Sequence, residues 1–343
     1  MTSKVQSLVE VDSLDIHVLI NDEIDQISPS PNPRVQHAQS FAGVPLCPLS
    51  DPSTRGGARL EMPMRNICCG AHGLSLFIVG MTAKKGDKSH TMLFDAGPEE
   101  DVFEKNAHRL RLPMADIGAI VLSHWHRDHS GGLLSAIRLA SSDRSDGSQV
   151  IVALPPDKPA YRGIMFDQPI SLEADPTMEE INSAGGKTTV LNECCTTLDG
   201  VFVISGEIPR QTAYEGGIPG GVRYDPAKDE WIKDEFIMEE RFVMCKLKGK
   251  GLVIFTGCSH AGLINIARHA KEIDDSPLYA IVGGYHLADA APEKMQQSMK
   301  DLKDLEPALL MPGHCTGWRF KGLIEKEMPG QMAPIFGGTK YSL

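Results

Sequence analysis

Alternating and continuous apolar runs along the chain predict many short strands and a few helices. Residues 14–20 alternate and then become fully apolar, which predicts a first strand. Residues 74–80 and 90–97 flank a polar turn, and this pattern predicts a β-hairpin. A helix is expected at 101–110. Further strands are expected at 117–124, 149–154, 187–192, 200–206 and 242–249.

The last third of the chain alternates regularly between predicted strands and helices. One helix places Met295, Met299 and Leu302 on a single face at i, i+4 and i+7, so these side chains are expected to pack on a sheet. Strands followed by strand–helix alternation are typical of an α/β layered domain with mixed sheets. The elements expected here are strands 251–257, 279–284 and 308–313 and helices 261–273 and 293–305.

Residues 28–65 interrupt this pattern. They contain many Pro, Gly and Ser residues and show little periodicity. A connection this long inside a compact domain is uncommon, and such segments form lids, act as binding loops or lack fixed structure. The sequence leaves the choice among these roles open.

Composition and charge narrow the class of protein. The length of 343 residues is compatible with about two domains or with one large α/β unit. A formal net charge of −11, without a run of five Lys or Arg residues, disfavours nucleic acid and anionic membranes as partners.

Eight cysteines without a CxxC pair are typical of a reducing compartment. The first residues lack the apolar stretch of a signal peptide, and no apolar run reaches about 18 residues, so we expect a cytoplasmic protein.

A dense cluster of metal-binding residue types follows the strand predicted at 117–124. Three imidazoles and one carboxylate occur within six residues, just before a Ser-Gly-Gly sequence that predicts a helix start. Zinc and iron readily accept these ligands, and a mononuclear site needs fewer groups than this segment offers. In an extended segment the side chains of His124 and His126 project to one side. Asp128 and His129 can then reach a second metal position next to the first. The spacing therefore predicts two metal ions side by side, with His124, His126, Asp128 and His129 as ligands.

The sequence His124-x-His126-x-Asp128-His129, with LFDAG upstream, resembles the metallo-β-lactamase superfamily. The resemblance implies an αββα sandwich with two mixed sheets, a single domain over residues 1–343, an insertion at 28–65 and a dinuclear metal site at one edge. It also implies that Asp95 of LFDAG supports the metal loop without being a ligand. A narrower resemblance, to the branch that includes dihydropterin–ribofuranosyl-aminobenzene phosphate synthases, rests on segments 71–78, 255–266, 281–287 and 311–317.

The chain departs from the superfamily pattern at the first metal site. The usual site takes a third histidine from between the HxHxDH segment and a strand that ends in a bridging aspartate. Here no histidine occurs between His129 and His260, and Cys258 stands near the position of the bridging aspartate. We therefore expect His260 to supply the third imidazole, while Cys258 binds metal, bridges the ions or simply packs.

Four other residues complete the candidate site. His314, which follows a predicted strand, resembles the family's last metal motif and is expected to complete the second metal position. His286 is a candidate ligand, general acid or substrate contact. The candidates for substrate binding are His72, just before the hairpin, and Arg210, whose guanidinium suits a carboxylate or a phosphate.

Together these residues predict a metal-dependent hydrolase. Two divalent ions, with zinc expected and iron or manganese as alternatives, would supply a metal-bound hydroxide that attacks a small ester, lactone, amide or phosphoester. Asp128 would orient the hydroxide, and His286 would donate a proton to the leaving group. The first alternative is a transferase or synthase that acts on a pterin-like or phosphorylated substrate, and the second is a metal-binding sensor without activity. The expected partner is a small molecule, and the sequence does not specify an oligomeric state.

Overall fold

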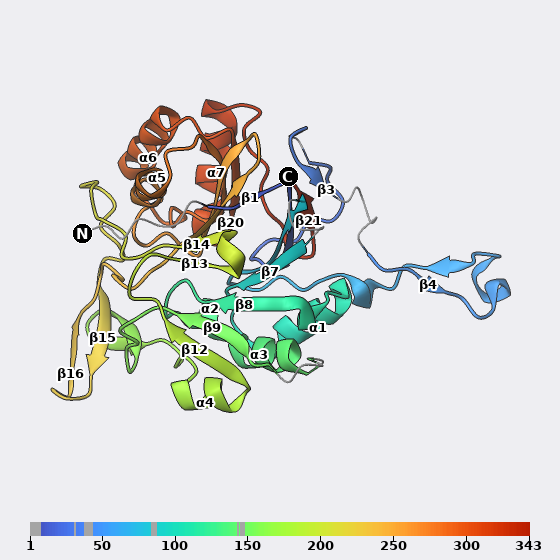
Figure 1. The fold of residues 1–343 in the computed structure, drawn as a ribbon, viewed down its shortest axis with the longest axis horizontal. Helices are drawn as coiled ribbons and strands as arrows, with labels where there is room; N and C mark the ends of the chain where they lie inside the picture. The colour runs from blue at the N-terminus through green and yellow to red at the C-terminus, as the bar shows by residue number, and fades with distance from the viewer. Residues whose placement is uncertain (1–7, 31, 38–43, 84–87, 143, 145–147) are drawn as a thin grey trace.

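Two mixed β-sheets lie face to face, and helices cover the outer side of each sheet (Figure 1). The computed structural model describes residues 8–30, 32–37, 44–83, 88–142, 144 and 148–343. This arrangement is the αββα sandwich with two mixed sheets that the sequence predicts, and the α/β class is confirmed.

The first sheet has eight strands in the order β12-β9-β8-β7-β6-β2-β21-β3. β7, β8, β9 and β12 pair in parallel, whereas β2, β6 and β7 pair antiparallel. The β6–β7 pair is the predicted hairpin. The strands are β2 (Ser13–Ile20), β3 (Gln36–His37), β6 (Ser75–Thr82), β7 (Lys88–Phe94), β8 (Ile117–Val121), β9 (Val150–Leu154), β12 (Gly186–Val190) and β21 (Lys340–Ser342).

The second sheet has seven strands. Its order is β13-β14-β17-β18-β19-β20, and β1 pairs with β17. β18, β19 and β20 run parallel, so their carboxyl ends meet at one edge of the sheet. The strands are β1 (Glu10–Val11), β13 (Cys195–Thr197), β14 (Phe202–Ile204), β17 (Val243–Leu247), β18 (Gly251–Thr256), β19 (Leu278–Gly284) and β20 (Leu309–Gly313).

Apolar clusters fill the three spaces between these layers. The central cluster lies between the sheets and includes Phe94 and Phe255, both fully buried. Met295, Met299 and Leu302 belong to the cluster under the second sheet's helices, as their spacing predicts. The remaining cluster lies under the helices of the first sheet. The helices are α1 (Glu100–Leu110), α2 (Arg127–Ser130), α3 (Leu133–Ser141) and α4 (Met178–Ser183), then α5 (Leu263–Ile273), α6 (Pro292–Asp304) and α7 (Gly317–Glu327).

A small four-stranded antiparallel sheet, which the sequence does not predict, stands beside the sandwich. Its order is β11-β10-β15-β16, so two hairpins far apart in the chain join at the β10–β15 contact. The segments are short and contain Pro and Gly residues, and the pairing that joins the two hairpins links segments far apart in the chain, so local periodicity does not reveal the sheet. The strands are β10 (Arg162–Met165), β11 (Pro169–Ser171), β15 (Gly221–Asp225) and β16 (Glu230–Lys233).

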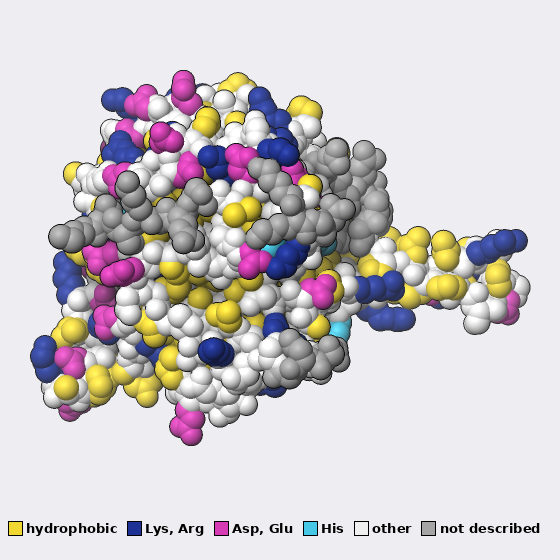
Figure 2. Space-filling model, viewed as in Figure 1, with side chains coloured by type: hydrophobic (Ala, Val, Ile, Leu, Met, Phe, Trp, Pro, Cys, Tyr) yellow, Lys and Arg dark blue, Asp and Glu magenta, His cyan; other side chains and the backbone are white. Residues whose placement is uncertain are grey.

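The Pro-rich insertion contains a two-stranded ribbon that projects from the body of the molecule (Figures 1 and 2). It consists of β4 (Cys47–Pro48) and β5 (Leu60–Glu61), with short 3₁₀ turns at Pro52–Arg55 and Met64–Asn66. None of the described residues of 28–65 lines the cavity that contains His126 and His314. Residues 31 and 38–43 of the insertion lie outside the described residues.

Among the helices of the described ranges, none is both long and apolar enough to cross a membrane.

Substitution of Phe255 tests the central core. The Phe255 ring is fully buried between the sheets, so Phe255→Ala leaves a cavity and should lower the free energy of unfolding by about 3–5 kcal/mol. Val190 on edge strand β12 is 47% exposed, and Val190→Ala should cost less than about 1 kcal/mol. Urea unfolding of the metal-free protein measures both, and equal losses for the two variants would contradict the sandwich core.

Candidate metal centre

A cavity of about 920 Å³ lies at the edge where the parallel strands of both sheets end. One wall is formed by residues that follow β8, β18, β19 and β20, including His126, Asp128, Cys258, His286 and His314. Because the carboxyl ends of parallel strands meet at one edge, residues that are far apart in sequence become neighbours there.

Three imidazoles form the first cluster. His124 Nε2 lies 3.0 Å from His126 Nδ1, and His260 Nε2 lies 3.1 Å from each of these two atoms. All three side chains are buried. A tetrahedral zinc ion with Zn–N bonds of about 2.0–2.1 Å places its ligand atoms about 3.3 Å apart, close to these separations.

The hydrogen bonds of Ser123 determine which ring nitrogen of His124 carries the proton. The Ser123 hydroxyl donates to Asp95 Oδ2, so its oxygen accepts the Nδ1–H of His124, 2.9 Å away. His124 Nε2 therefore presents a lone pair to the other two imidazoles. Burial, together with repulsion from the neighbouring imidazoles, lowers the pKa of His124 and His260 well below the usual value. Burial also lowers the pKa of His126, to about 3. Neutral nitrogens that converge in this way suit a cation.

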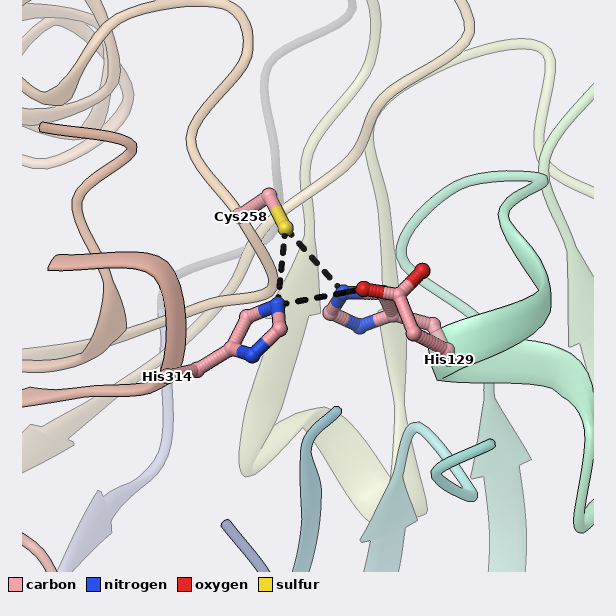
Figure 3. A group of neighbouring side chains, drawn as sticks. His129, Cys258 and His314 are labelled. Atoms are coloured by element: carbon pink, nitrogen blue, oxygen red, sulfur yellow. Dashed lines mark hydrogen bonds and ion pairs between the residues drawn. The ribbon is translucent and has the colours of Figure 1, made fainter. Parts of the chain in front are cut away.

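The second cluster combines a thiol, a carboxylate and two imidazoles. The Cys258 Sγ atom lies 3.1 Å from His129 Nε2 and 3.1 Å from His314 Nε2, and Figure 3 shows all three side chains pointing toward one another. Asp128 Oδ2 lies 3.3 Å from His314 Nε2 and 3.6 Å from His129 Nε2. The rings of His124 and His129 have centroids 4.4 Å apart, so the two clusters are adjacent.

Carboxylates behind the second cluster orient its imidazoles. Asp95 Oδ2 accepts the Nδ1–H of His129 at 2.7 Å, and Asp22 Oδ1 accepts the Nδ1–H of His314 at 2.8 Å. Each ring therefore directs Nε2 into the cluster, which is the arrangement that carboxylate–histidine pairs give to metal ligands. Burial opposes the charged form of His129, but the charges of Asp128 and Asp95 outweigh it and raise its pKa.

The donor sets fit two divalent ions. The first cluster offers three neutral nitrogens, and the second offers nitrogen, oxygen and sulfur together with negative charge. Imidazole, carboxylate and thiolate are ligands that zinc accepts, and imidazole and carboxylate also suit iron and manganese. Residues that sequence analysis assigns to two separate metal positions thus lie in two separate groups, and Cys258 lies with the second.

Two supporting residues, Asp22 and Glu240, have no signal in the sequence analysis. Asp22, which orients His314, stands just past β2 in a polar stretch without a recognisable motif. Glu240 is fully buried, and its carboxylate accepts the backbone N–H groups of His260 at 2.9 Å and Ala261 at 2.6 Å. These carboxylates act through distant partners, so no local spacing identifies them.

The three remaining candidate residues lie in different surroundings. His72 is on the cavity rim with a side chain that is 71% exposed, and its Nδ1 lies 2.8 Å from Asp22 Oδ2. This hydrogen bond raises the pKa of His72. His286 also lines the cavity, and its ring centroid lies 4.4 Å from that of His260. Arg210 is not a cavity residue, because its guanidinium donates to the carbonyl oxygens of Ile208, Phe236 and Ile237.

Comparison with known proteins agrees with this fold. Residues 81–243 match the family model of the metallo-beta-lactamase superfamily. A crystal structure of a metal-dependent hydrolase of the beta-lactamase superfamily superimposes with a TM-score of 0.66 and 22% identity, over 95% of this chain and 98% of that chain. The chain therefore has the metallo-β-lactamase fold, and residues 81–243 are similar to the superfamily's family model.

Two curated relatives come from Methanocaldococcus jannaschii. The chain is 26% identical over 274 residues to 7,8-dihydropterin-6-methyl-4-(beta-D-ribofuranosyl)-aminobenzene-5'-phosphate synthase, which covers 78% of this chain and 88% of the relative. It is 28% identical over 229 residues to an uncharacterized protein, with coverage of 66% and 80%. The first similarity agrees with the narrower resemblance found in the sequence.

Glu240 offers a test of how the first cluster is positioned. Glu240→Ala removes the acceptor of two buried backbone N–H groups, so we expect the metal-free protein to lose at least about 2 kcal/mol of unfolding free energy. Glu207 is exposed, and Glu207→Ala should change stability by less than about 0.5 kcal/mol. Urea unfolding compares the two variants. A Glu240→Ala protein as stable as the Glu207→Ala protein would show that these hydrogen bonds do not hold the His260 loop.

Proposed function

We propose that the chain is a two-metal hydrolase that acts on a small ester, lactone, amide or phosphoester. The observation that supports this proposal most strongly is the convergence of two adjacent donor clusters on one cavity. In the proposal, one ion is held by three imidazoles and the other by a mixed set of ligands. The ligands are His124, His126 and His260 for the first ion, and Asp128, His129, Cys258 and His314 for the second.

A pair of divalent ions, when bound, activates water as a nucleophile and polarises the group under attack. The residues of the chain supply position and charge. Asp128 and Cys258 bring negative charge to the second position, and the Asp128 side chain is 23% exposed toward the cavity. Its carboxylate can therefore accept a hydrogen bond from a reacting water molecule while it remains a ligand.

The cavity wall opposite the donor clusters suits an apolar part of the substrate. The small sheet and the loops beside it contribute Ile164, Phe166, Leu172, Ile218 and Ile237 to this wall. The rest of the lining is rich in charged and histidine side chains, and a cavity that combines apolar surface with polar groups is typical of a site for a small molecule. We therefore propose a small-molecule partner and, because all eight cysteines are free, a cytoplasmic location.

The other sequence candidates receive different roles in this proposal. His72 is proposed to contact the substrate from the cavity rim, because its exposed ring is held by Asp22. Arg210 is given no substrate role, since its guanidinium donates hydrogen bonds to backbone carbonyl oxygens. Proton donation by His286 stays a prediction, and the proximity of Cys258 and Cys315 favours a role as a ligand.

A synthase activity is the second candidate function, and the similarity to the M. jannaschii synthase supports it. The relative's name describes a reaction that builds a phosphorylated pterin compound. The same donor clusters would polarise a phosphorylated substrate, and water would then have to be excluded from the reacting centre. The two candidates differ in whether one substrate suffices for turnover.

The His126 imidazole should be essential for both metal and turnover. His126→Ala removes one of three ligands at the first position, so bound metal should fall by at least one ion per chain and turnover should be lost. His108 is exposed on α1, and His108→Ala serves as the control that retains both. Elemental analysis of protein purified without added metal gives the stoichiometry. Full metal content and activity in His126→Ala would exclude the proposed centre.

A substrate panel separates the two candidate activities. A hydrolase should release acid from a single ester, lactone or phosphodiester, and a chelator should abolish this release. A synthase should show no such release until a second substrate is added. A wild-type chain that binds no zinc, iron or manganese would exclude both activities, whereas metal binding without turnover of any substrate would favour a sensor.

A further inference from the structure

Three parallel strands place a cysteine, a histidine and a second cysteine side by side at the edge of the second sheet. β18 ends at Thr256, β19 at Gly284 and β20 at Gly313, and these strands are paired in parallel with Thr256 opposite Gly283 and Gly284 opposite Gly313. The residue two positions beyond each strand end is a potential metal ligand. These residues are Cys258, His286 and Cys315.

The side chains of these residues converge. One ligand atom from each, the two sulfur atoms and a ring nitrogen of His286, all lie within 4.8 Å of one another. The Cys315 thiol also lies 3.4 Å from the carbonyl oxygen of Cys258. All three residues line the cavity. Tetrahedral zinc with Zn–S bonds of about 2.3 Å separates two thiolates by about 3.8 Å, and the ligand atoms of this group lie within 4.8 Å of one another.

The backbone around this group is adapted to bring the thiols together. A Cβ atom at Gly284 would lie 2.7 Å from Cys315 Sγ and 3.3 Å from Cys258 Cα, so a side chain there would displace the Cys315 thiol. His286 has a φ of 47°, in the left-handed region that non-glycine residues seldom adopt. Strained backbone of this kind occurs where the position of a side chain matters for function.

We propose that Cys258, His286 and Cys315 form a third cation site, which binds a soft divalent ion such as zinc beside the two-metal centre. Two thiolates and one imidazole are a donor set that zinc favours over magnesium or calcium, and the cavity leaves a fourth position open. The proposal rests on the proposed function in one respect, because Cys258 Sγ also faces His129 and His314 and would bridge the second and third ions.

Negative charge near the centre is sufficient for a third divalent ion. Two thiolates and the carboxylate of Asp128 belong to the ligand sets themselves. Asp95 and Asp22 lie directly behind ligand imidazoles, and Glu240 binds the loop that holds His260. These six acidic groups together balance three divalent ions, which limits the repulsion that closely spaced cations would otherwise experience.

Metal stoichiometry tests the third site directly. Wild-type protein, kept reduced, saturated with Zn²⁺ and desalted, should contain three zinc ions per chain by elemental analysis. Cys315→Ala and His286→Ala should each contain two, because each loses one of only three protein ligands. Cys47 lies on the projecting ribbon, and the matched control Cys47→Ala should retain three. Circular dichroism checks that every variant is folded.

Alkylation of the wild-type chain gives a second readout that does not depend on a variant. Zn²⁺ should slow the reaction of Cys315 with iodoacetamide by roughly tenfold, whereas exposed Cys195 should react at the same rate with or without zinc. Two ions in the wild type, unprotected Cys315 or an unchanged count in Cys315→Ala would overturn the third site.

The result also distinguishes this proposal from the one on which it rests. If the wild type contains two ions and His126→Ala contains one, the two-metal centre stands and the third site alone fails. If the wild type contains no zinc, both proposals fail together.

Discussion

The candidate centre depends on the hydrogen bonds that the buried carboxylate of Asp95 accepts. Asp95 is 1% exposed and accepts three hydrogen bonds, from the backbone N–H of Ser123, the hydroxyl of Ser123 and the Nδ1–H of His129. Through Ser123, Asp95 determines which ring nitrogen of His124 is protonated in the first cluster. Through its bond to His129, it orients an imidazole of the second cluster. One carboxylate at the end of β7 thus fixes the direction of lone pairs in both groups, and its own backbone adopts a φ of 58° to reach them.

Most of the sandwich could be predicted from sequence because its elements are regular and its faces are strongly apolar. The strands of the last third and the face formed by Met295, Met299 and Leu302 follow directly from periodicity. The small sheet of β10, β11, β15 and β16 could not be predicted in this way, because its hairpins are short and pair with distant partners. The superfamily resemblance, rather than periodicity, indicated how the layers stack.

The residues of the candidate site also fall into those that the sequence indicates and those that it does not. His124, His126, Asp128 and His129 are recognisable because their spacing is local, and strand ends indicated His260 and His314. Sequence left the role of Cys258 open, and the structure places its sulfur 3.1 Å from a ring nitrogen of both His129 and His314. Asp22 and Glu240 have no local signature, since each forms its decisive hydrogen bond across a long sequence separation. The direction of the Arg210 guanidinium, which donates to backbone carbonyl oxygens, could not be inferred from residue type.

The division of the ligands between the two sheets has a mechanical consequence. The segment that matches the family model ends at residue 243, so it contains the donors that follow β8 but none of those that follow β18, β19 and β20. The imidazole cluster (His124, His126 and His260) and the second cluster (Asp128, His129, Cys258 and His314) each draw side chains from both halves of the sandwich. A cation held there would therefore link the two sheets at this edge, and its binding free energy would add to the stability of the folded chain. Loss of the ion would remove this contribution to the contact between the two sheets.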